Sequence, residues 1–375
     1  MKVLFLNPPF LKKFSRSQRS PAVTKSGTLY FPMWLAYSAG VLMDKGFEVD
    51  FIDAPADGLS LDAVEKRVKN FSPALIVMDT STPSIKNDIA VGGKLKDLCY
   101  STFLAVVGTH VSALPDDVLN MDNRIGAVAR YEYDLTILDI ASTLKKGGDL
   151  KDVLGISYKK DGKIIHNQRR PFIDDLDAIP FVSKVYKKFL KIENYFNPNA
   201  LYPMVTITTS RGCPFPCTFC VYPQTLMGRS FRARSIENVA AEMAYIVENF
   251  PQAKAIFFED DTLTVDKKRC KALSEEILRK KLKITWTANS RIGLDLETMK
   301  KMKEAGCRSL CVGFESGSQL ILDKMKKKTK PAEMMEFMRN AKKAGILIHG
   351  CFLVGLPGET KDTAKETLAS CKVSL

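Results

Sequence analysis

Histidine, paired metal-binding cysteine motifs and long apolar runs are all scarce in this 375-residue sequence. It contains three histidines, and its nine cysteines include a single C-x2-C pair. A structural zinc loop normally needs four ligands, often two such pairs, so this class of site is disfavoured. The odd cysteine count and the lack of a secretory signal argue against a disulfide framework and indicate a reducing cytoplasm. No apolar run approaches the ~20 residues of a membrane span, so no transmembrane segment is expected.

The formal net charge of +14 is unevenly distributed. Residues 1–150 contain 17 basic and 17 acidic side chains, so the excess lies in the remaining 225 residues. Much of the excess lies in short runs of basic residues. In most proteins such runs lie on solvent-exposed faces of helices. Attraction to an anionic substrate, to nucleic acid or to an acidic reductase is the alternative, and composition does not separate these interpretations.

Three thiols lie close together near the middle of the chain. Cys213, Cys217 and Cys220 have the spacing C-x3-C-x2-C and follow the apolar run 205–209. Soft thiolates suit iron–sulfur clusters and zinc. Three of them can hold three corners of an iron–sulfur cube and leave one iron open to a non-protein ligand. The other six cysteines are scattered and are expected to be isolated, among them Cys311 and Cys351.

The first 150 residues alternate short apolar runs with amphipathic stretches, which predicts a doubly wound parallel sheet. Strands are expected at 2–6, 49–53, 75–78, 103–107 and 127–130, and helices at 33–45, 61–70, 85–98 and 135–145. Ligands bind such sheets beyond the carboxyl ends of the strands. The residues expected there are Asn7, Pro8, Thr80, Ser81, Gly108, Thr109 and His110.

These strand ends resemble those of the cobalamin-binding domain that is joined to many radical S-adenosylmethionine (SAM) enzymes. The similarity is carried by Asn7-Pro8-Pro9, by 80–84 and by 108–115. It implies that the seven strand-end residues bind cobalamin. The D-x-H-x-x-G segment that supplies a cobalt ligand in many B12 proteins is missing, so no protein histidine is expected on the metal. A degenerate domain that has lost cobalamin is the alternative.

A connection is predicted at 151–203, between the two α/β regions. A hairpin at 156–166 should turn at Asp161-Gly162, because these residue types favour positive φ. The stretch that follows is rich in Asp and Pro and then in aromatic residues, which usually pack domains together.

The segment 204–375 repeats a strand–helix pattern, which predicts a partial (β/α) barrel. Strands are expected at 205–209, 255–259, 284–288, 309–314 and 346–354, and helices at 236–250, 267–280, 296–305 and 332–344. Functional groups of such barrels gather at the carboxyl ends of the strands. These ends carry Glu259, Asp260, Asp261, Glu315, Ser316 and the stretch from Leu353 to Gly355.

The cysteine loop, with Phe219 before its last cysteine, resembles the cluster loop of the radical SAM superfamily. The resemblance implies that Cys213, Cys217 and Cys220 hold a [4Fe-4S] cluster whose open iron binds SAM. It also implies roles for the strand ends: carboxylates for the methionine ammonium, Glu315 for the ribose and backbone groups for the adenine. The SAM-binding residues are then Phe219, Glu259, Asp260, Asp261, Glu315, Ser316, Leu353 and Gly355.

Nearly the whole chain resembles the cobalamin-domain radical SAM enzymes of hopanoid biosynthesis, over 5–9, 30–35, 79–84, 180–186, 211–225, 257–264 and 349–360. This implies hydrogen abstraction, rearrangement or ring contraction on a lipid- or sugar-linked small molecule. A flavodoxin- or ferredoxin-type protein would supply the electron, and no nucleic-acid partner is expected. A cobalamin-dependent radical methyltransferase or methylthiotransferase is the first alternative.

The sequence ends without the sixth strand and helix expected of the partial barrel. The resulting hypothesis is a C-terminally truncated barrel, either natural or a fragment, because an open sheet edge is normally avoided. A catalytically inactive binding module is therefore the second alternative.

Overall fold

The computed structural model describes residues 1–373, without side chains from 372 on, and divides into two compact units. The first unit contains Met1–Asn197 together with Val221–Gly228. The second contains Pro198–Cys220 and the chain from Arg229 on. The hairpin expected within the connection is thus part of the first unit, and so is the short segment after the cysteine loop.

The first unit is built on a seven-stranded sheet in the order β2-β1-β3-β4-β5-β6-β7. Its strands are β1 (Lys2–Asn7), β2 (Glu48–Asp53), β3 (Leu75–Asp79), β4 (Phe103–Val107), β5 (Ala127–Ala129), β6 (Ile156–Lys160) and β7 (Lys163–His166). The five expected strands are confirmed, and they pair in parallel. The hairpin β6–β7 adds two antiparallel strands to the edge at β5.

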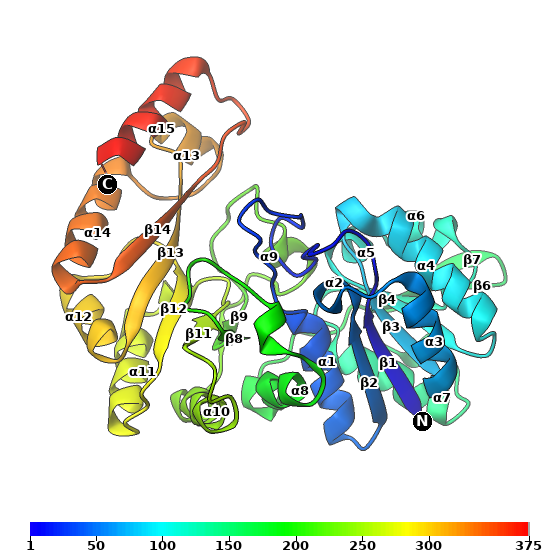
Figure 1. The fold of residues 1–375 in the computed structure, drawn as a ribbon. Helices are drawn as coiled ribbons and strands as arrows, with labels where there is room; N and C mark the ends of the chain where they lie inside the picture. The colour runs from blue at the N-terminus through cyan, green and yellow to red at the C-terminus, as the bar shows by residue number, and fades with distance from the viewer. Residues whose placement is uncertain (374–375) are drawn as a thin grey trace. The chain divides into compact units, whose positions relative to one another are not determined.

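Helices cover this sheet on both faces (Figure 1). They are α1 (Met33–Asp44), α3 (Leu61–Phe71), α4 (Ile85–Leu98), α6 (Pro115–Met121), α7 (Asp134–Lys145) and α8 (Val182–Phe189), with the short α2 (Ala54–Asp57), α5 (Thr109–Ala113) and α9 (Tyr222–Thr225). Helix α1 packs against α7 and α8, whereas α3 packs against α4. The doubly wound arrangement predicted from the sequence is confirmed.

Alternation along β1 explains why both faces are covered. Leu4 and Leu6 belong to a core cluster with Val64 of α3, Ile89 of α4 and Val118 of α6. The intervening residue Phe5 faces the other way and stacks on Phe51, whose ring in turn stacks on Phe189 of α8. Successive side chains of a strand point to opposite faces, so a fully apolar strand needs helices on both sides.

The second unit contains five parallel strands in the order β14-β13-β12-β11-β8. They are β8 (Met204–Ile207), β11 (Ala255–Phe258), β12 (Thr285–Ser290), β13 (Cys307–Glu315) and β14 (Leu347–Phe352). A two-stranded ribbon, β9 (Ser210–Arg211) and β10 (Arg232–Ala233), brackets the cysteine loop. All five strands predicted for the barrel region are confirmed.

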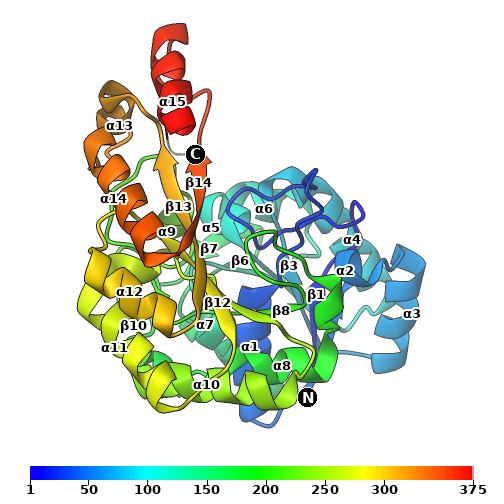
Figure 2. The same cartoon turned by 60° about the vertical axis from the view of Figure 1, so that its left-hand side comes forward.

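Helices α10, α11, α12 and α14 lie in a row along one face of this sheet (Figure 2). The helices of the unit are α10 (Ile236–Asn249), α11 (Lys267–Arg279), α12 (Leu296–Glu304), α13 (Gln319–Lys324), α14 (Pro331–Ala344) and α15 (Lys361–Val373). None of the helices in the described part of the chain is long and apolar enough to cross a membrane.

The opposite face of the five-stranded sheet, which we call the inner face, is polar. Phe314 of β13 faces the helices and meets Phe337 of α14 edge-on. Alternation therefore turns Ser309, Cys311 and Glu315 toward the inner face. There the Ser309 hydroxyl lies 2.9 Å from the Thr287 hydroxyl of β12.

Candidate active site

The cysteine loop leaves the carboxyl end of β8 and is fastened there by Asp260. Asp260 follows β11, the neighbour of β8, and its side chain is fully buried. Its carboxylate accepts from the backbone N–H and the hydroxyl of Thr209, both at 2.6 Å, and from the Ser210 hydroxyl at 3.0 Å. Burial raises the pKa of Asp260 and these hydrogen bonds oppose the rise. Both oxygens are thus engaged by the start of the loop, a positioning role that the sequence did not reveal.

The two neighbouring carboxylates differ from Asp260 in their surroundings. Asp261 Oδ2 accepts from the backbone N–H of Gly212 at 3.1 Å, one residue before the first cysteine. Glu259 is buried, and its backbone N–H donates to the Ile207 carbonyl of β8 at 2.9 Å. Contact of these acids with the SAM ammonium stays a prediction.

Two arginines, the buried Arg234 and the partly buried Arg269, hold the backbone at the base of the loop. Arg234 Nη1 donates to the Thr208 carbonyl at 2.8 Å and pairs with the buried Glu242 at 2.5 Å. Arg269 Nη2 donates to the Thr209 carbonyl at 3.1 Å, and its Nη1 donates to the Thr209 hydroxyl at the same distance. Carbonyls of irregular backbone need such donors when they are buried.

Arg291 contacts the cysteine loop itself. It follows β12, and its guanidinium lies 3.8 Å from the centre of the Phe215 ring. Its Nη1 lies 3.4 Å from Cys217 Sγ, and its Nη2 donates to the Lys327 carbonyl. The sequence alone gave no sign that Arg291 would reach a cysteine.

The three thiols suit a cluster better than a single metal ion. Cys217 is buried, and Cys213 and Cys220 are partly buried. Burial raises the pKa of Cys213 to about 11, with smaller effects from Asp261 and the other two thiols. In the described chain their sulfurs do not form a group within 4.8 Å, the spacing that suits one ion. A cube binds each cysteine through a different iron, and a donor such as Arg291 tunes its sulfur ligands.

Glu315, the residue expected at the SAM ribose, lies at the end of β13 in an unusual conformation. Its φ is +70°, a region that non-glycine residues adopt rarely and that is enriched at functional sites. Its Oε1 accepts from Lys327 Nζ at 2.8 Å, and both side chains are buried. Lys327 Nζ also lies 5.9 Å from the centre of the Phe219 ring, so it links the predicted ribose residue to the cysteine loop.

The other predicted SAM residues of the second unit are held by local contacts. The Ser316 hydroxyl lies 3.0 Å from that of Thr367 on α15. Leu353 donates its backbone N–H to the Glu315 carbonyl at 2.9 Å, and Gly355 donates to Glu359 Oε2 at 2.6 Å. The backbone after β14 therefore lies beside Glu315, as a shared nucleoside site requires, although contact with SAM stays a prediction.

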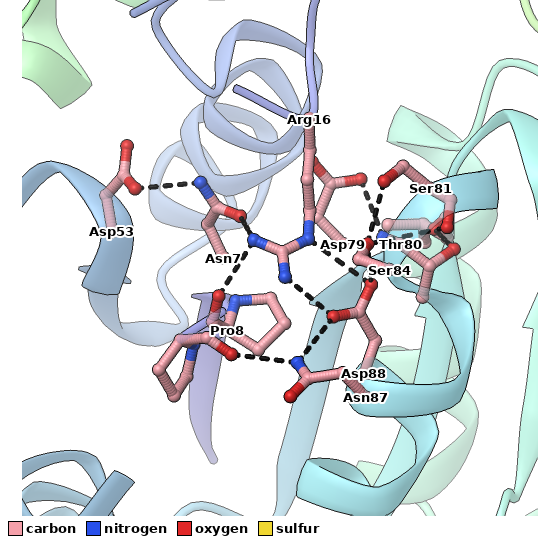
Figure 3. Close-up of polar contacts among 12 residues, drawn as sticks. Asn7, Pro8, Arg16, Asp53, Asp79, Thr80, Ser81, Ser84, Asn87 and Asp88 are labelled. Atoms are coloured by element: carbon pink, nitrogen blue, oxygen red, sulfur yellow. Dashed lines mark hydrogen bonds and ion pairs between the residues drawn. The ribbon is translucent and has the colours of Figure 1, made fainter. Parts of the chain in front are cut away.

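A buried ionic network occupies the carboxyl ends of β1, β2 and β3 in the first unit (Figure 3). Arg16 pairs with Asp88 at 2.6 Å, and neither side chain is exposed to solvent. Arg16 Nη1 also donates to Asn7 Oδ1 and to the Pro8 carbonyl, both at 2.8 Å. Asn7 in turn donates to Asp53 Oδ1 at 2.7 Å. Asn7 and Pro8, predicted to bind cobalamin, thus orient Arg16, which the sequence did not single out.

Two buried acids of this region have strongly raised pKa values. Burial raises the pKa of Asp79, at the end of β3, to about 7, against the opposing charge of Arg16. Burial also raises the pKa of Asp53 to about 6, although Tyr195 donates to it at 2.8 Å. Perturbed carboxyls beyond the strands of a doubly wound sheet are typical of ligand-binding regions.

The loops after β3 and β4 are packed against each other. The Thr80 hydroxyl donates to the Val107 carbonyl at 2.7 Å, and the Ser81 hydroxyl lies 2.7 Å from that of Ser84. Gly108 has φ +122°, and a Cβ there would lie 2.4 Å from the Thr80 carbonyl oxygen. The close approach requires glycine at 108 whether or not it also touches a ligand.

His110, next to Thr109 at the start of α5, offers a group that a ligand could use. Its Nδ1 lies 3.2 Å from the Thr82 hydroxyl. Its Nε2 is buried and has no hydrogen-bond partner in the described chain. A buried nitrogen of this kind normally finds a partner, and the amide groups around a corrin ring would provide one. The loop therefore fits cobalamin.

Comparison with known proteins agrees with both units. Residues 207–371 match the model of the Radical SAM superfamily, and residues 19–140 match that of the B12 binding domain. An uncharacterized methyltransferase of Pyrococcus horikoshii is 32% identical over 373 residues, which cover 99% of this chain and 78% of that protein. An anaerobic magnesium-protoporphyrin IX monomethyl ester cyclase of Rubrivivax gelatinosus is 27% identical over 98% of this chain and 65% of its own length.

Two solved structures share the fold along the whole chain. The cobalamin-dependent SAM radical enzyme OxsB, with aqua-cobalamin and SAM bound, gives a TM-score of 0.78 at 20% identity, over 98% of this chain and 51% of that one. The radical SAM methyltransferase TsrM of Kitasatospora setae gives a TM-score of 0.79 at 17% identity, over 100% of this chain and 71% of that one. This chain thus spans about half of OxsB and about two thirds of the Rubrivivax cyclase.

The chain belongs to the radical SAM superfamily of enzymes. Within it, the chain is one of the members that carry a B12-binding domain. Its cofactors are SAM, a [4Fe-4S] cluster and cobalamin, and it needs a reductant and a substrate.

Proposed function

We propose that this enzyme is a cobalamin-dependent radical SAM methyltransferase that acts on a small molecule. The observation that carries the proposal is the 32% identity to the Pyrococcus methyltransferase along 99% of this chain. A cytidylyl-2-hydroxyethylphosphonate methyltransferase of Streptomyces wedmorensis, 26% identical over 95% of the chain, supports the same reaction class.

The rearrangement or ring contraction inferred from the hopanoid resemblance is less well supported. One of the relatives is a hopanoid C-3 methylase of Methylococcus capsulatus, 26% identical over 66% of this chain. Its name describes methyl transfer and not rearrangement of a carbon skeleton. Methyl transfer, first considered as the alternative, is therefore the better proposal, and a hopanoid substrate has no specific support.

The chain's own residues have definable tasks in this proposal. Cys213, Cys217 and Cys220 would hold the cluster, and Arg291 would donate toward Cys217 Sγ. When bound, the cluster and SAM supply radical chemistry, and cobalamin supplies the capacity to carry a methyl group. The Lys327–Glu315 pair would help to hold the nucleoside of SAM, and the buried network around Arg16 would fix the strand ends that bind cobalamin.

The test measures which products the enzyme forms from SAM. The anaerobically reconstituted chain is incubated with SAM, cobalamin and a chemical reductant, and S-adenosylhomocysteine and 5′-deoxyadenosine are quantified. A methyltransferase should release S-adenosylhomocysteine only when cobalamin is present, about one per cobalamin without substrate. C217A is the inactive control and C99S the matched cysteine control. Release of 5′-deoxyadenosine alone, at any cobalamin concentration, would contradict methyl transfer.

Radical oxidation or cyclisation is the second candidate, because the Rubrivivax cyclase matches 98% of this chain. The same assay separates it, since that chemistry consumes SAM without removing its methyl group.

The electron donor is proposed to be a small acidic flavodoxin or ferredoxin. The net charge of +14 would attract such a partner. We also propose a location in the reducing cytoplasm, and the odd cysteine count of the sequence supports it. A rate of SAM cleavage that falls steeply with salt when flavodoxin replaces a chemical reductant would support the acidic partner.

A further inference from the structure

Two cysteines and a histidine that are separate in the sequence meet on the second unit. The sulfurs of Cys311 and Cys351 lie 3.6 Å apart, and the ligand atoms of Cys311, His349 and Cys351 all lie within 4.8 Å of one another. Cys311 is on β13, and the other two are on β14. This corrects the expectation that Cys311 and Cys351 are isolated thiols.

The three side chains point to the inner face of the sheet. In the parallel pairing Cys311 lies opposite His349, and Gly313 lies opposite Cys351. Gly350, between the two β14 residues, faces the other way, since a Cβ there would lie 2.9 Å from the Phe314 ring. His349 is exposed and the two cysteines are partly buried, so the cluster is accessible from this face. Cys311 shares the inner side of β13 with Glu315.

Strand geometry disfavours a disulfide between the two cysteines. Cys351 is two positions beyond the residue that pairs with Cys311. A spacing of about 4.8 Å between strands and a rise of about 6.6 Å for two residues place the Cα atoms roughly 8 Å apart. A disulfide does not form without backbone movement beyond about 7 Å. By contrast, two thiolates on one tetrahedral zinc ion, each bound at about 2.3 Å, have sulfurs about 3.8 Å apart.

We propose that Cys311, His349 and Cys351 form a second metal site, which binds one Zn²⁺ through two thiolates and one imidazole. Both thiols release their protons to solvent on binding, and the histidine coordinates in its neutral form. The soft ligand set selects zinc over magnesium or calcium. This site is separate from the C-x3-C-x2-C loop and uses none of its residues.

The fourth position of this zinc is open. Among the described residues no further histidine, cysteine or carboxylate belongs to the group. Three protein ligands and one exchangeable position are the arrangement of catalytic zinc, whereas structural zinc is closed by four. The open position faces the same side of the sheet as Glu315, so we infer that it binds a sulfur, nitrogen or oxygen atom of the substrate and orients it.

The test observes zinc directly in the complete chain, with the iron cluster in place. The reconstituted protein receives one equivalent of Zn²⁺, is desalted, and is examined by metal analysis and by X-ray absorption at the zinc edge. Absorption at the zinc edge reports on zinc alone, so the iron cluster does not contribute to the spectrum. We expect one zinc per chain with two sulfur ligands near 2.3 Å, one imidazole nitrogen and one light atom near 2.0 Å.

Variants assign the ligands. C311S and C351S should each remove one sulfur from the zinc spectrum and lower zinc retention at least tenfold, and H349A should remove the imidazole scattering. C99S, in the first unit, should change nothing. Zinc with three sulfurs in the wild type, which would indicate the cluster cysteines, would overturn the site. Zinc that is not retained, or a Cys311–Cys351 disulfide found by mass spectrometry, would also overturn it. None of these readouts depends on methyl transfer.

Discussion

Arg291 donates from Nη1 toward Cys217 Sγ across 3.4 Å while its guanidinium stacks on Phe215, two residues earlier in the same loop. One side chain just beyond β12 thereby fixes the loop and places positive charge beside a predicted cluster ligand. Hydrogen bonds and charge near the sulfurs are among the main determinants of cluster potential.

We therefore expect Arg291→Gln to make the cluster harder to reduce. Loss of a cation beside the cluster disfavours the reduced, more negative state, so the midpoint potential should fall. SAM cleavage should slow by roughly tenfold, which corresponds to ~1.4 kcal/mol. An EPR-monitored redox titration measures the potential. Arg291→Lys keeps the positive charge, so its midpoint potential should fall less than that of R291Q. An unchanged midpoint potential in R291Q would show that the contact does not act on the cluster.

Asp260→Asn should loosen the cysteine loop. The amide would place its NH2 group against the donors of Thr209 and Ser210, which a carboxylate satisfies. A buried donor left without an acceptor costs about 1–3 kcal/mol. The expected results are a lower unfolding temperature and loss of most of the iron on gel filtration. Asp261→Asn weakens the contact with Gly212 and should lose less iron. Equal iron retention in both variants would disprove the positioning role of Asp260.

Arg16→Met should destabilise the first unit strongly. The variant leaves Asp88 buried without its cation, and breaking a buried pair on one side costs about 3–5 kcal/mol. The double variant R16M/D88N should recover part of the loss. Arg124, which pairs at the surface with Asp97 and Asp122, gives a matched control, and R124M should change stability by about 1 kcal/mol or less. Urea unfolding followed by circular dichroism measures all three, and a similar loss in R16M and R124M would contradict this assignment.

The buried carboxyl of Asp79 should make stability depend on pH. In the folded chain its pKa is about 7, against 3.8 for the ordinary group. Between these values the folded state binds more protons than the unfolded state, so the free energy of unfolding falls as pH rises from about 4 to about 7. Asp79→Asn removes this dependence. The stability of the variant relative to wild type should therefore be greater at pH 8 than at pH 4, by on the order of 4 kcal/mol. Urea unfolding at several pH values measures this. If the free energies of unfolding of the two proteins differed by a constant amount from pH 4 to pH 8, the role of Asp79 would be ruled out.

Much of the fold could be predicted because the signals are local. The ten core strands expected in the two α/β regions are present, and the hairpin at 156–166 forms around Asp161-Gly162 as its turn residues indicate. The hairpin's place at the edge of the first sheet was not predictable, because pairing with β5 depends on tertiary packing. The same holds for the segment after Cys220, which belongs to the first unit.

The predicted site residues were found in the expected loops, yet several have partners that the sequence did not indicate. Asn7 and Pro8 orient Arg16, Asp260 fastens Thr209, and Glu315 pairs with Lys327. Strand ends are readable from periodicity, so the loops could be located. A side chain's partner depends on which distant segment packs against it.

The sequence by itself determined the strand–helix alternation, the spacing of Cys213, Cys217 and Cys220, and the polar residues that follow the strands. These features depend on neighbours within a few residues. Tertiary structure alone decided that Arg16 meets Asp88, that Arg291 reaches Cys217, and that Cys311 joins His349 and Cys351. The contacts Arg16–Asp88 and Arg291–Cys217 join residues more than 70 positions apart. Their physical basis is strand order and register, which no local pattern specifies.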